Sequence, residues 1–292
     1  MQQNEELKQA WDFVEHTGKS IFLTGKAGTG KTTFLRAIQS NSTKRMVVVA
    51  PTGVAAINAG GVTIHSFFQL PLSPFVPGVK MESRYDFSEE KRKIIRTLDL
   101  LIIDEISMVR SDLLDAIDAV LRRYRDHSRP FGGVQLLMIG DLQQLTPVVT
   151  PEDERLLADH YATPYFFGSK ALSAIDYVTI ELRHVYRQQD RTFIDLLNHI
   201  RDNQITDNDL ALLNSRYVAD FHPAAEEGYI RLTTHNAKAN NYNTQALKRL
   251  DKASFTYRAE IDRDFPESTF PTDEELELKV GAQVMFVRND PS

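Results

Sequence analysis

Ile21-Phe-Leu-Thr-Gly25-Lys-Ala-Gly-Thr-Gly-Lys31-Thr32 is the stretch that decides the fold of this chain. From Gly25 onward it matches the pattern G-x-x-x-x-G-K-[ST], placed after an apolar strand and at the start of a helix. Glycines in such a loop let backbone N–H groups turn towards phosphate oxygens, and the helix N-terminus adds positive potential. The stretch therefore predicts a nucleotide-binding loop. The alternative, a chance glycine-rich turn before a helix, needs strand, loop and helix to coincide.

Short apolar runs alternate with helical patterns on both sides of this loop. Leu7, Ala10, Trp11 and Val14 fall on one face of an opening helix, and a second apolar face runs from Leu113 to Tyr124. Strands that are apolar on both faces are typical of a parallel sheet covered by helices. The first half is therefore predicted to be α/β, with strands at 21–23, 46–50, 100–103, 135–139 and 178–182.

The length of 292 residues favours about two domains. We place the first at residues 1–181, with an insertion at about 68–96, and the second at 182–292. The second series contains expected helices at 192–201, 207–215 and 236–250, with Asn236 as the cap of the last one. Strands are expected at 230–233 and 282–287.

The composition excludes several functional classes. With 34 Lys and Arg against 40 Asp and Glu, the net charge is −6, so any nucleic-acid site must be a local groove. The chain has no cysteine, which removes disulfides and thiolate zinc sites. The polar start is unlike a signal peptide, and the apolar runs are too short to span a bilayer. We expect a cytoplasmic protein without membrane contact, nucleoid-associated if it is bacterial.

Two further motifs lie at the ends of expected strands. Asp104 and Glu105 follow Leu100-Leu-Ile-Ile103, where the first carboxylate can hold Mg²⁺ and the second can polarise a water molecule. The alternative is a solvated acidic turn. Gly140-Asp-Leu-Gln-Gln144 follows the next apolar strand, so its polar side chains reach the same sheet edge, the usual ligand crevice of open α/β sheets. Alone, this third motif is equally compatible with an ordinary turn.

The three motifs in this order resemble those of superfamily-one helicases, and finer detail is similar to the PIF (petite integration frequency) DNA helicases. The similar segments are Ala50-Pro-Thr-Gly-Val-Ala-Ala56, Val62-Thr-Ile-His-Ser-Phe67, Glu105-Ile-Ser-Met108, Arg129-Pro-Phe-Gly-Gly-Val-Gln-Leu136, Gly140-Asp-Leu-Gln-Gln-Leu-Thr-Pro-Val148 and Leu182-Arg-His-Val-Tyr-Arg-Gln188. The resemblance covers most of residues 5–250. It implies two RecA-like P-loop NTPase domains, the second incomplete because the family's last motifs have no counterpart before Ser292.

The resemblance also implies an activity and its ligands. The family's members are ATP-dependent DNA helicases that move 5′ to 3′ on single-stranded DNA and act in DNA repair, recombination and telomere maintenance. For this chain it implies ATP and Mg²⁺ as cofactors and single-stranded DNA and tailed duplex DNA as partners, and we expect a monomer. Two alternatives stay open: a RecD-like recombination helicase, and an ATP-regulated single-stranded nucleic-acid clamp that does not unwind.

Site residues are carried over motif by motif. The catalytic candidates are Lys31, Glu105, Gln144 as the γ-phosphate sensor and Arg187 as an arginine finger. Nucleotide-binding candidates are Gly25, Lys26, Ala27, Gly28, Thr29, Gly30, Lys31, Thr32 and Thr33, with Asn4 in place of the family's adenine-reading glutamine. Thr32 and Asp104 are the metal candidates.

DNA contacts are expected from small polar residues in turns that follow strands. The candidates are Pro51, Thr52, Gly53, Thr63, His65, Ser66, Thr234, His235 and Asn236. From the residues alone, His65 and His235 are more simply explained as capping or packing histidines. The resemblance favours DNA contact for His65 and leaves both readings open for His235.

Overall fold

The computed structural model describes residues 4–79, 87–186, 190–224, 227–261 and 272–284. Internal contacts divide the chain into two units, with the division between Arg201 and Asp202. The boundary that we proposed at 181/182 lies earlier, where the last strand of the sheet ends. The first unit therefore keeps the helix α9 (Arg191–Arg201), which the sequence pattern had assigned to the second domain.

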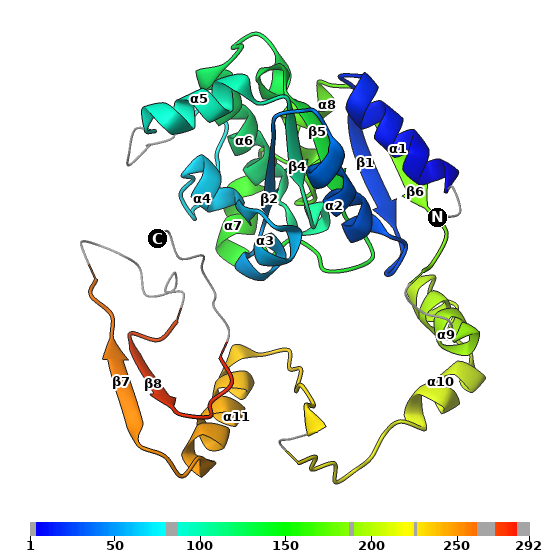
Figure 1. Cartoon of the computed structure of the whole chain (residues 1–292), viewed down its shortest axis with the longest axis vertical. Coiled ribbons are helices and arrows are strands. Elements are labelled where there is room, and N and C mark those ends of the chain that lie inside the picture. The colour runs from blue at the N-terminus through cyan, green and yellow to red at the C-terminus, as the bar shows by residue number, and fades with distance from the viewer. Residues whose placement is uncertain (1–3, 80–86, 187–189, 225–226, 262–271, 285–292) are drawn as a thin grey trace. The chain divides into compact units, whose positions relative to one another are not determined.

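A parallel six-stranded sheet forms the centre of the first unit (Figure 1). Its order is β3-β2-β4-β5-β1-β6, and each neighbouring pair is parallel. The five strands predicted in this unit are confirmed, and the two-residue strand β3 is an addition. Their bounds are β1 Ser20–Gly25, β2 Met46–Ala50, β3 Val62–Thr63, β4 Leu100–Ile103, β5 Gln135–Ile139 and β6 Tyr177–Leu182. The α/β fold class is therefore confirmed.

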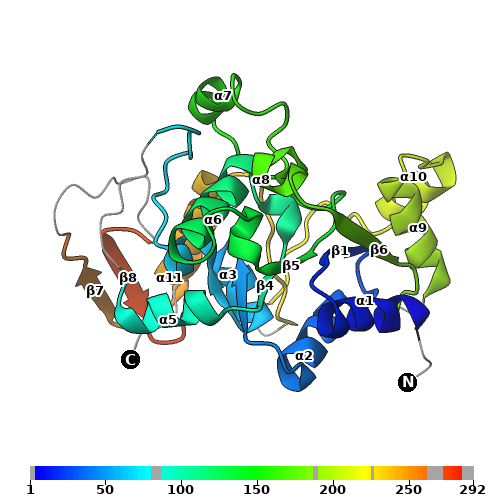
Figure 2. The ribbon, with the colours of Figure 1, turned by 90° about the horizontal axis from the view of Figure 1, so that it is seen from above.

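Helices cover both faces of this sheet. Successive strand residues point to opposite faces, so Ile21 and Leu23 pack with α1 and α2, whereas Phe22 packs in the core beside α6 and α8. Figure 2 shows α1 and α2 on one side of the strands and α6 and α8 on the other. The helices are α1 Glu5–His16, α2 Lys31–Asn41, α3 Gly53–Ala59, α4 Ile64–Phe68, α5 Glu89–Thr97, α6 Ser111–Tyr124, α7 Pro151–Leu157 and α8 Lys170–Ser173.

This two-sided burial explains the near-continuous apolar strands. All four residues of β4 and all five of β5 are buried. Because the strands are parallel, their carboxyl ends share one edge, and the glycine-rich loop, the Asp104–Glu105 pair and the Gly140 motif each follow one of these ends. Part of the expected insertion is also fixed: the Phe75 N–H donates to an Asp112 carboxylate oxygen of α6 at 2.9 Å.

The second unit differs from its sequence prediction. It contains α10 (Asp207–Asn214), α11 (Asn236–Arg249) and an antiparallel pair, β7 (Ser254–Arg258) with β8 (Glu275–Lys279), which was not predicted. The strand expected at 230–233 is wrong, because no described strand pairs with it and Leu232 is 90% exposed. Residues 282–284 are not a strand either, and 285–287 lie outside the described residues. His235, rather than Asn236, is the N-cap of α11.

None of the helices in the described part of the chain is long and apolar enough to cross a membrane.

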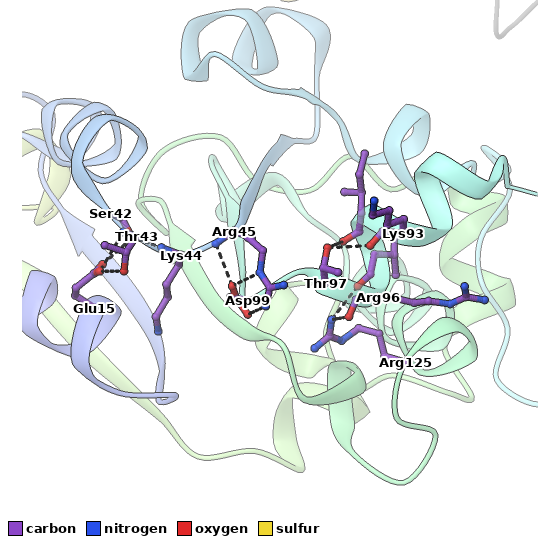
Figure 3. A network of polar contacts seen from close by, with 12 residues as sticks. Glu15, Ser42, Thr43, Lys44, Arg45, Lys93, Arg96, Thr97, Asp99 and Arg125 are labelled. Carbon is purple, nitrogen blue, oxygen red and sulfur yellow. Dashed lines mark hydrogen bonds and ion pairs between the residues drawn. The ribbon is translucent and has the colours of Figure 1, made fainter.

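Hydrogen bonds to the Glu15 carboxylate join α1 to the segment after α2 (Figure 3). Glu15 accepts hydrogen bonds from the Ser42 hydroxyl at 2.6 Å, from the Thr43 N–H at 3.1 Å and from the Thr43 hydroxyl. These donors, Ser42 first, lower the pKa of Glu15 from 4.5 to about 2. The ionised carboxylate is therefore favoured by the folded state.

We expect Glu15→Gln to lower the free energy of unfolding at pH 7 by about 1 kcal/mol, because solvent screens much of the electrostatic gain at this position. Because the pKa of Glu15 is lower in the folded than in the unfolded state, its carboxylate stabilises the folded state at pH values above 4.5. This contribution is lost as the pH falls towards 2. Urea unfolding at pH 7 and pH 3 measures it, with Glu5→Gln, an exposed carboxylate of the same helix, as control. A deficit of equal size at both pH values would contradict this account.

Candidate functional site

The glycine-rich loop is a compact turn between β1 and α2. Thr29 is buried, and its hydroxyl and its N–H both donate to the Lys26 carbonyl, at 2.8 and 3.3 Å. Gly30 is the N-cap of α2 and has φ of 98°, a left-handed conformation that a side chain would strain. The loop thus presents backbone N–H groups at a helix N-terminus, as phosphate binding requires.

Lys31 places its ammonium within this loop. Its Nζ donates to the carbonyls of Gly25 at 2.6 Å and Lys26 at 3.1 Å. Burial lowers the pKa of Lys31, while the negative charges of Asp141 and Glu105 oppose that shift. Since phosphate oxygens carry full negative charge, a bound nucleotide competes effectively with the two carbonyls for this ammonium.

Two carboxylates follow β4, next to the loop's neighbour β5. The Asp104 N–H donates to the Val49 carbonyl at 2.9 Å, which fixes where the strand ends. Burial, followed by the charge of Glu105, raises the pKa of Asp104 to about 6. Glu105 has φ of 51° and ψ of 45°, left-handed values that are strained for a residue with a side chain. Such strain is typical of functional sites.

Gly140 brings the second and third motifs into contact. A Cβ atom at this position would lie 2.9 Å from Ile106 Cγ2 and 3.1 Å from the Ser107 nitrogen. After Gly140, the Asp141 side chain accepts from the Gln144 side-chain amide at 3.0 Å and from the Gln143 N–H at 3.1 Å. The three predicted motifs therefore meet at one edge of the sheet.

The donor set suits Mg²⁺ bound together with a nucleotide. The described residues contain no group of three or more His, Cys, Asp or Glu that could hold a metal by itself. Mg²⁺ prefers hard oxygen ligands and often binds through one or two carboxylates plus substrate phosphates. The Asp104 carboxylate is half-buried and has a raised pKa, so a nearby cation would stabilise its ionised form. The Thr32 hydroxyl at the start of α2 would supply a second oxygen ligand.

Tyr186 lies against the loop, which the sequence analysis did not anticipate. Its N–H donates to the Gly28 carbonyl at 2.8 Å, and its ring lies 3.7 Å from where a Cβ at Gly30 would be. Asn4 caps α1 by accepting from the Leu7 N–H, and its amide donates to the Tyr186 hydroxyl at 3.2 Å. Asn4 is thus held beside the loop, although its adenine-reading role stays a prediction.

The DNA candidates of the first unit follow β2 and β3, at one end of the sheet. Thr52 and Thr63 cap α3 and α4, because their hydroxyls accept from the Ala55 and Ser66 N–H groups. Pro51, Thr52 and Gly53 lie where β2 passes into α3, and Thr63, His65 and Ser66 lie where β3 passes into α4; the two junctions are adjacent because Ala50 pairs with Thr63.

His65 is half-buried. Burial, followed by the positive charge of Arg110, lowers the pKa of His65 and so favours the neutral imidazole. The Ser66 carbonyl accepts from Lys91 Nζ at 3.2 Å, and that ammonium also lies 4.9 Å from the Phe67 ring centroid. Lys91 therefore ties α5 to the α4 turn.

The remaining candidates lie elsewhere. Thr234, His235 and Asn236 are exposed in the second unit, and the Thr234 hydroxyl lies 2.8 Å from His235 Nδ1. Arg187 lies outside the described residues.

Helix α9 supplies two contacts that no motif indicated. Lys26 Nζ donates to the Asn198 side-chain oxygen at 2.7 Å, and Arg201 forms an ion pair with Asp141. Asn198 and Arg201 lie in an ordinary amphipathic helical pattern, so nothing in the local sequence distinguishes them from surface residues.

Comparisons with known proteins agree with this geometry. The profile of the PIF1-like helicase family matches residues 2–210. The ATP-dependent DNA helicase PIF1 of Rattus norvegicus is 37% identical over 292 residues, covering 93% of this chain and 42% of that protein. The corresponding Pif1 of Bdellovibrio bacteriovorus is 31% identical, covering 94% of this chain and 61% of that protein.

Solved structures are similar over nearly the whole chain. The Bacteroides Pif1 structure with single-stranded DNA gives a TM-score of 0.88 at 41% identity, covering 99% of this chain and 66% of that chain. The Bacteroides Pif1 complex with ADP-AlF3 and single-stranded DNA gives 0.85 at 39% identity, covering 96% of this chain and 64% of that chain. This chain spans 42% of the length of the rat relative and 61% of the length of the Bdellovibrio relative.

Proposed function

Because this chain belongs to the PIF1-like helicase family, we propose that it carries the ATP site of an ATP-dependent DNA helicase that moves 5′ to 3′ on single-stranded DNA and separates duplexes. One observation carries the proposal. Lys31, the Asp104–Glu105 pair and Asp141 meet beside the glycine-rich loop, while the DNA candidates of the first unit follow β2 and β3 at the same sheet edge. The family membership favours this proposal over a RecD-like helicase.

Each residue has a role in the proposed chemistry. Bound Mg·ATP supplies the phosphoanhydride whose hydrolysis drives movement. Lys31 neutralises charge on the transferring phosphoryl group, Thr32 and Asp104 hold the metal, and Glu105 accepts the proton of the attacking water. Gln144 senses the terminal phosphate, and Arg187 stabilises the charge of the transition state. The site residues and the two-domain division at 181/182 remain part of the proposal.

The sheet offers a route for coupling ATP to DNA. β4, which carries Asp104, lies directly beside β2, and β2 pairs with β3. A change at the Asp104 end of β4 therefore reaches the β2 turn with no strand between them, and the β3 turn across β2 alone. We propose single-stranded DNA and tailed duplexes as substrates, a monomeric protein, and a cytoplasmic location at the nucleoid if the source is bacterial.

The decisive experiment is ATP hydrolysis with and without single-stranded DNA, combined with strand displacement on 5′-tailed and 3′-tailed duplexes. We expect stimulation by DNA and displacement of the 5′-tailed duplex only. Hydrolysis without displacement by the full-length protein would instead identify an ATP-regulated clamp. Absence of DNA-stimulated hydrolysis would reject both the helicase and the clamp.

We expect the DNA affinity to depend weakly on salt. The slope of log K against log salt scales with the number of phosphates neutralised, at about 0.9 for each. None of the DNA candidates is a lysine or an arginine, so we expect a slope smaller in magnitude than about 3. Fluorescence anisotropy on a single-stranded oligonucleotide from 50 to about 300 mM salt measures it.

A steep slope would contradict those candidates and move attention to the arginines near the end of α6. We do not expect these arginines to bind DNA, because two of them already make contacts within the protein. Arg125 donates to the carbonyls of Ile95, Arg96 and Gly132, and Arg122 pairs with Asp118 at 2.8 Å. Part of this network is visible in Figure 3.

A further inference from the structure

Asp141 is the most completely satisfied carboxylate at the nucleotide site. Its side chain is 1% exposed and accepts from three groups: the Arg201 guanidinium, the Gln144 side-chain amide at 3.0 Å and the Gln143 N–H at 3.1 Å. The Arg201 and Gln144 donors share one oxygen, Oδ2. The position of the Gln144 amide is therefore linked to the position of Arg201 through a single atom.

Electrostatics favour this arrangement. Burial alone would raise the pKa of Asp141, but its hydrogen bonds, Arg201 first, hold the pKa below its usual value. Removing Arg201 would leave a buried carboxylate without its cation. That carboxylate would then attract the Lys31 ammonium more strongly, because the charge of Asp141 raises the pKa of Lys31 and the charge of Arg201 opposes this effect.

A second contact fixes the same helix. Asn198 lies one turn before Arg201 in α9, on the same helical face, and accepts from Lys26 Nζ at 2.7 Å. Leu196, also in α9, is buried. One helix thus touches both the glycine-rich loop and the third motif, at positions that neither motif includes.

We propose that Arg201 is a positioning residue of the ATP site: through Asp141 it holds the Gln144 amide ready for the terminal phosphate, so that α9 responds to whether ATP or ADP is bound. The inference rests on the proposed function, because it takes Gln144 to be the reader of that phosphate. Arg201 itself does not need to touch the nucleotide. Loss of Arg201 should weaken the binding of ATP more than the binding of ADP, because ADP lacks the terminal phosphate that Gln144 contacts in this proposal.

The test is a double-mutant cycle in the full-length protein with Arg201→Ala, Gln144→Ala and both together. We expect Arg201→Ala to weaken binding of a non-hydrolysable ATP analogue about tenfold or more, and ADP binding less than about threefold. Because both variants remove the same interaction, the double variant should bind the analogue no more than about twofold more weakly than Gln144→Ala alone. Arg201→Lys, which keeps the charge, should restore part of the loss.

Arg191→Ala is the matched control, since Arg191 is an exposed arginine of the same helix. Additive losses in the cycle, or equal losses for the ATP analogue and ADP, would overturn the proposal. If circular dichroism shows that Arg201→Ala does not fold, the cycle is run with Arg201→Lys, and an unchanged ratio of the two affinities overturns it. A wild-type protein without DNA-stimulated hydrolysis would reject the proposed function, whereas an active wild type with an additive cycle would reject only this inference.

Discussion

Lys31→Ala should reduce ATP turnover by about 10³-fold or more while single-stranded DNA binding stays within about threefold of wild type. The ammonium is held inside the glycine-rich loop by the Gly25 and Lys26 carbonyls, whereas the Lys26 ammonium donates to Asn198. The DNA candidates of the first unit follow β2 and β3, which are separated from β1 by β4 and β5. Removing one charge at the start of α2, just after the loop that follows β1, should therefore leave the DNA surface of the first unit unchanged.

Steady-state hydrolysis and fluorescence anisotropy on the same preparations measure both effects. Lys8→Ala provides the matched control, because Lys8 is an exposed lysine of α1 whose ion pair with Asp12 is on the helix surface. We expect this control to behave as wild type. Turnover that survives in Lys31→Ala would mean that the nucleotide lies elsewhere. An equal loss of DNA binding would mean that the two sites are not separate.

Glu105→Gln should lower the hydrolysis rate by about 10²- to 10⁴-fold while ATP remains bound. Glutamine has the size of glutamate and the same difficulty with the left-handed backbone at this position, so the local structure should not relax. What the amide lacks is the ability to accept a proton from water. The variant should therefore accumulate bound, unhydrolysed ATP.

Single-turnover quench experiments with labelled ATP separate retention from hydrolysis. Asp104→Asn is the informative partner variant, because it alters the neighbouring carboxylate that we assign to the metal. It should weaken Mg²⁺-dependent ATP binding, whereas Glu105→Gln should not. Wild-type hydrolysis in Glu105→Gln, or a loss of ATP binding equal to that of Asp104→Asn, would reassign the two carboxylates.

Local pattern was sufficient for the sheet and for the nucleotide loop. β4 and β5 were predicted with the bounds that the structure shows, because strands buried on both faces need apolar residues at every position. The same reasoning was wrong at Ile230 to Thr233. An apolar run becomes a strand only where a partner strand pairs with it, and no described strand lies beside this one. The pair β7 and β8 was missed for the converse reason, since all of β7 is exposed.

The sequence by itself determined that a glycine-rich loop follows a buried strand and that two carboxylates follow another. Both features can be recognised locally, because a short run of adjacent residues specifies each: apolar residues for the strand, and glycines or carboxylates after it. Only the tertiary structure decided which distant side chains complete the site. Asn198 reaches Lys26 across 172 positions, and Arg201 reaches Asp141 across 60. No periodicity records such pairs, since each arises from the docking of a helix whose own pattern specifies only its apolar face.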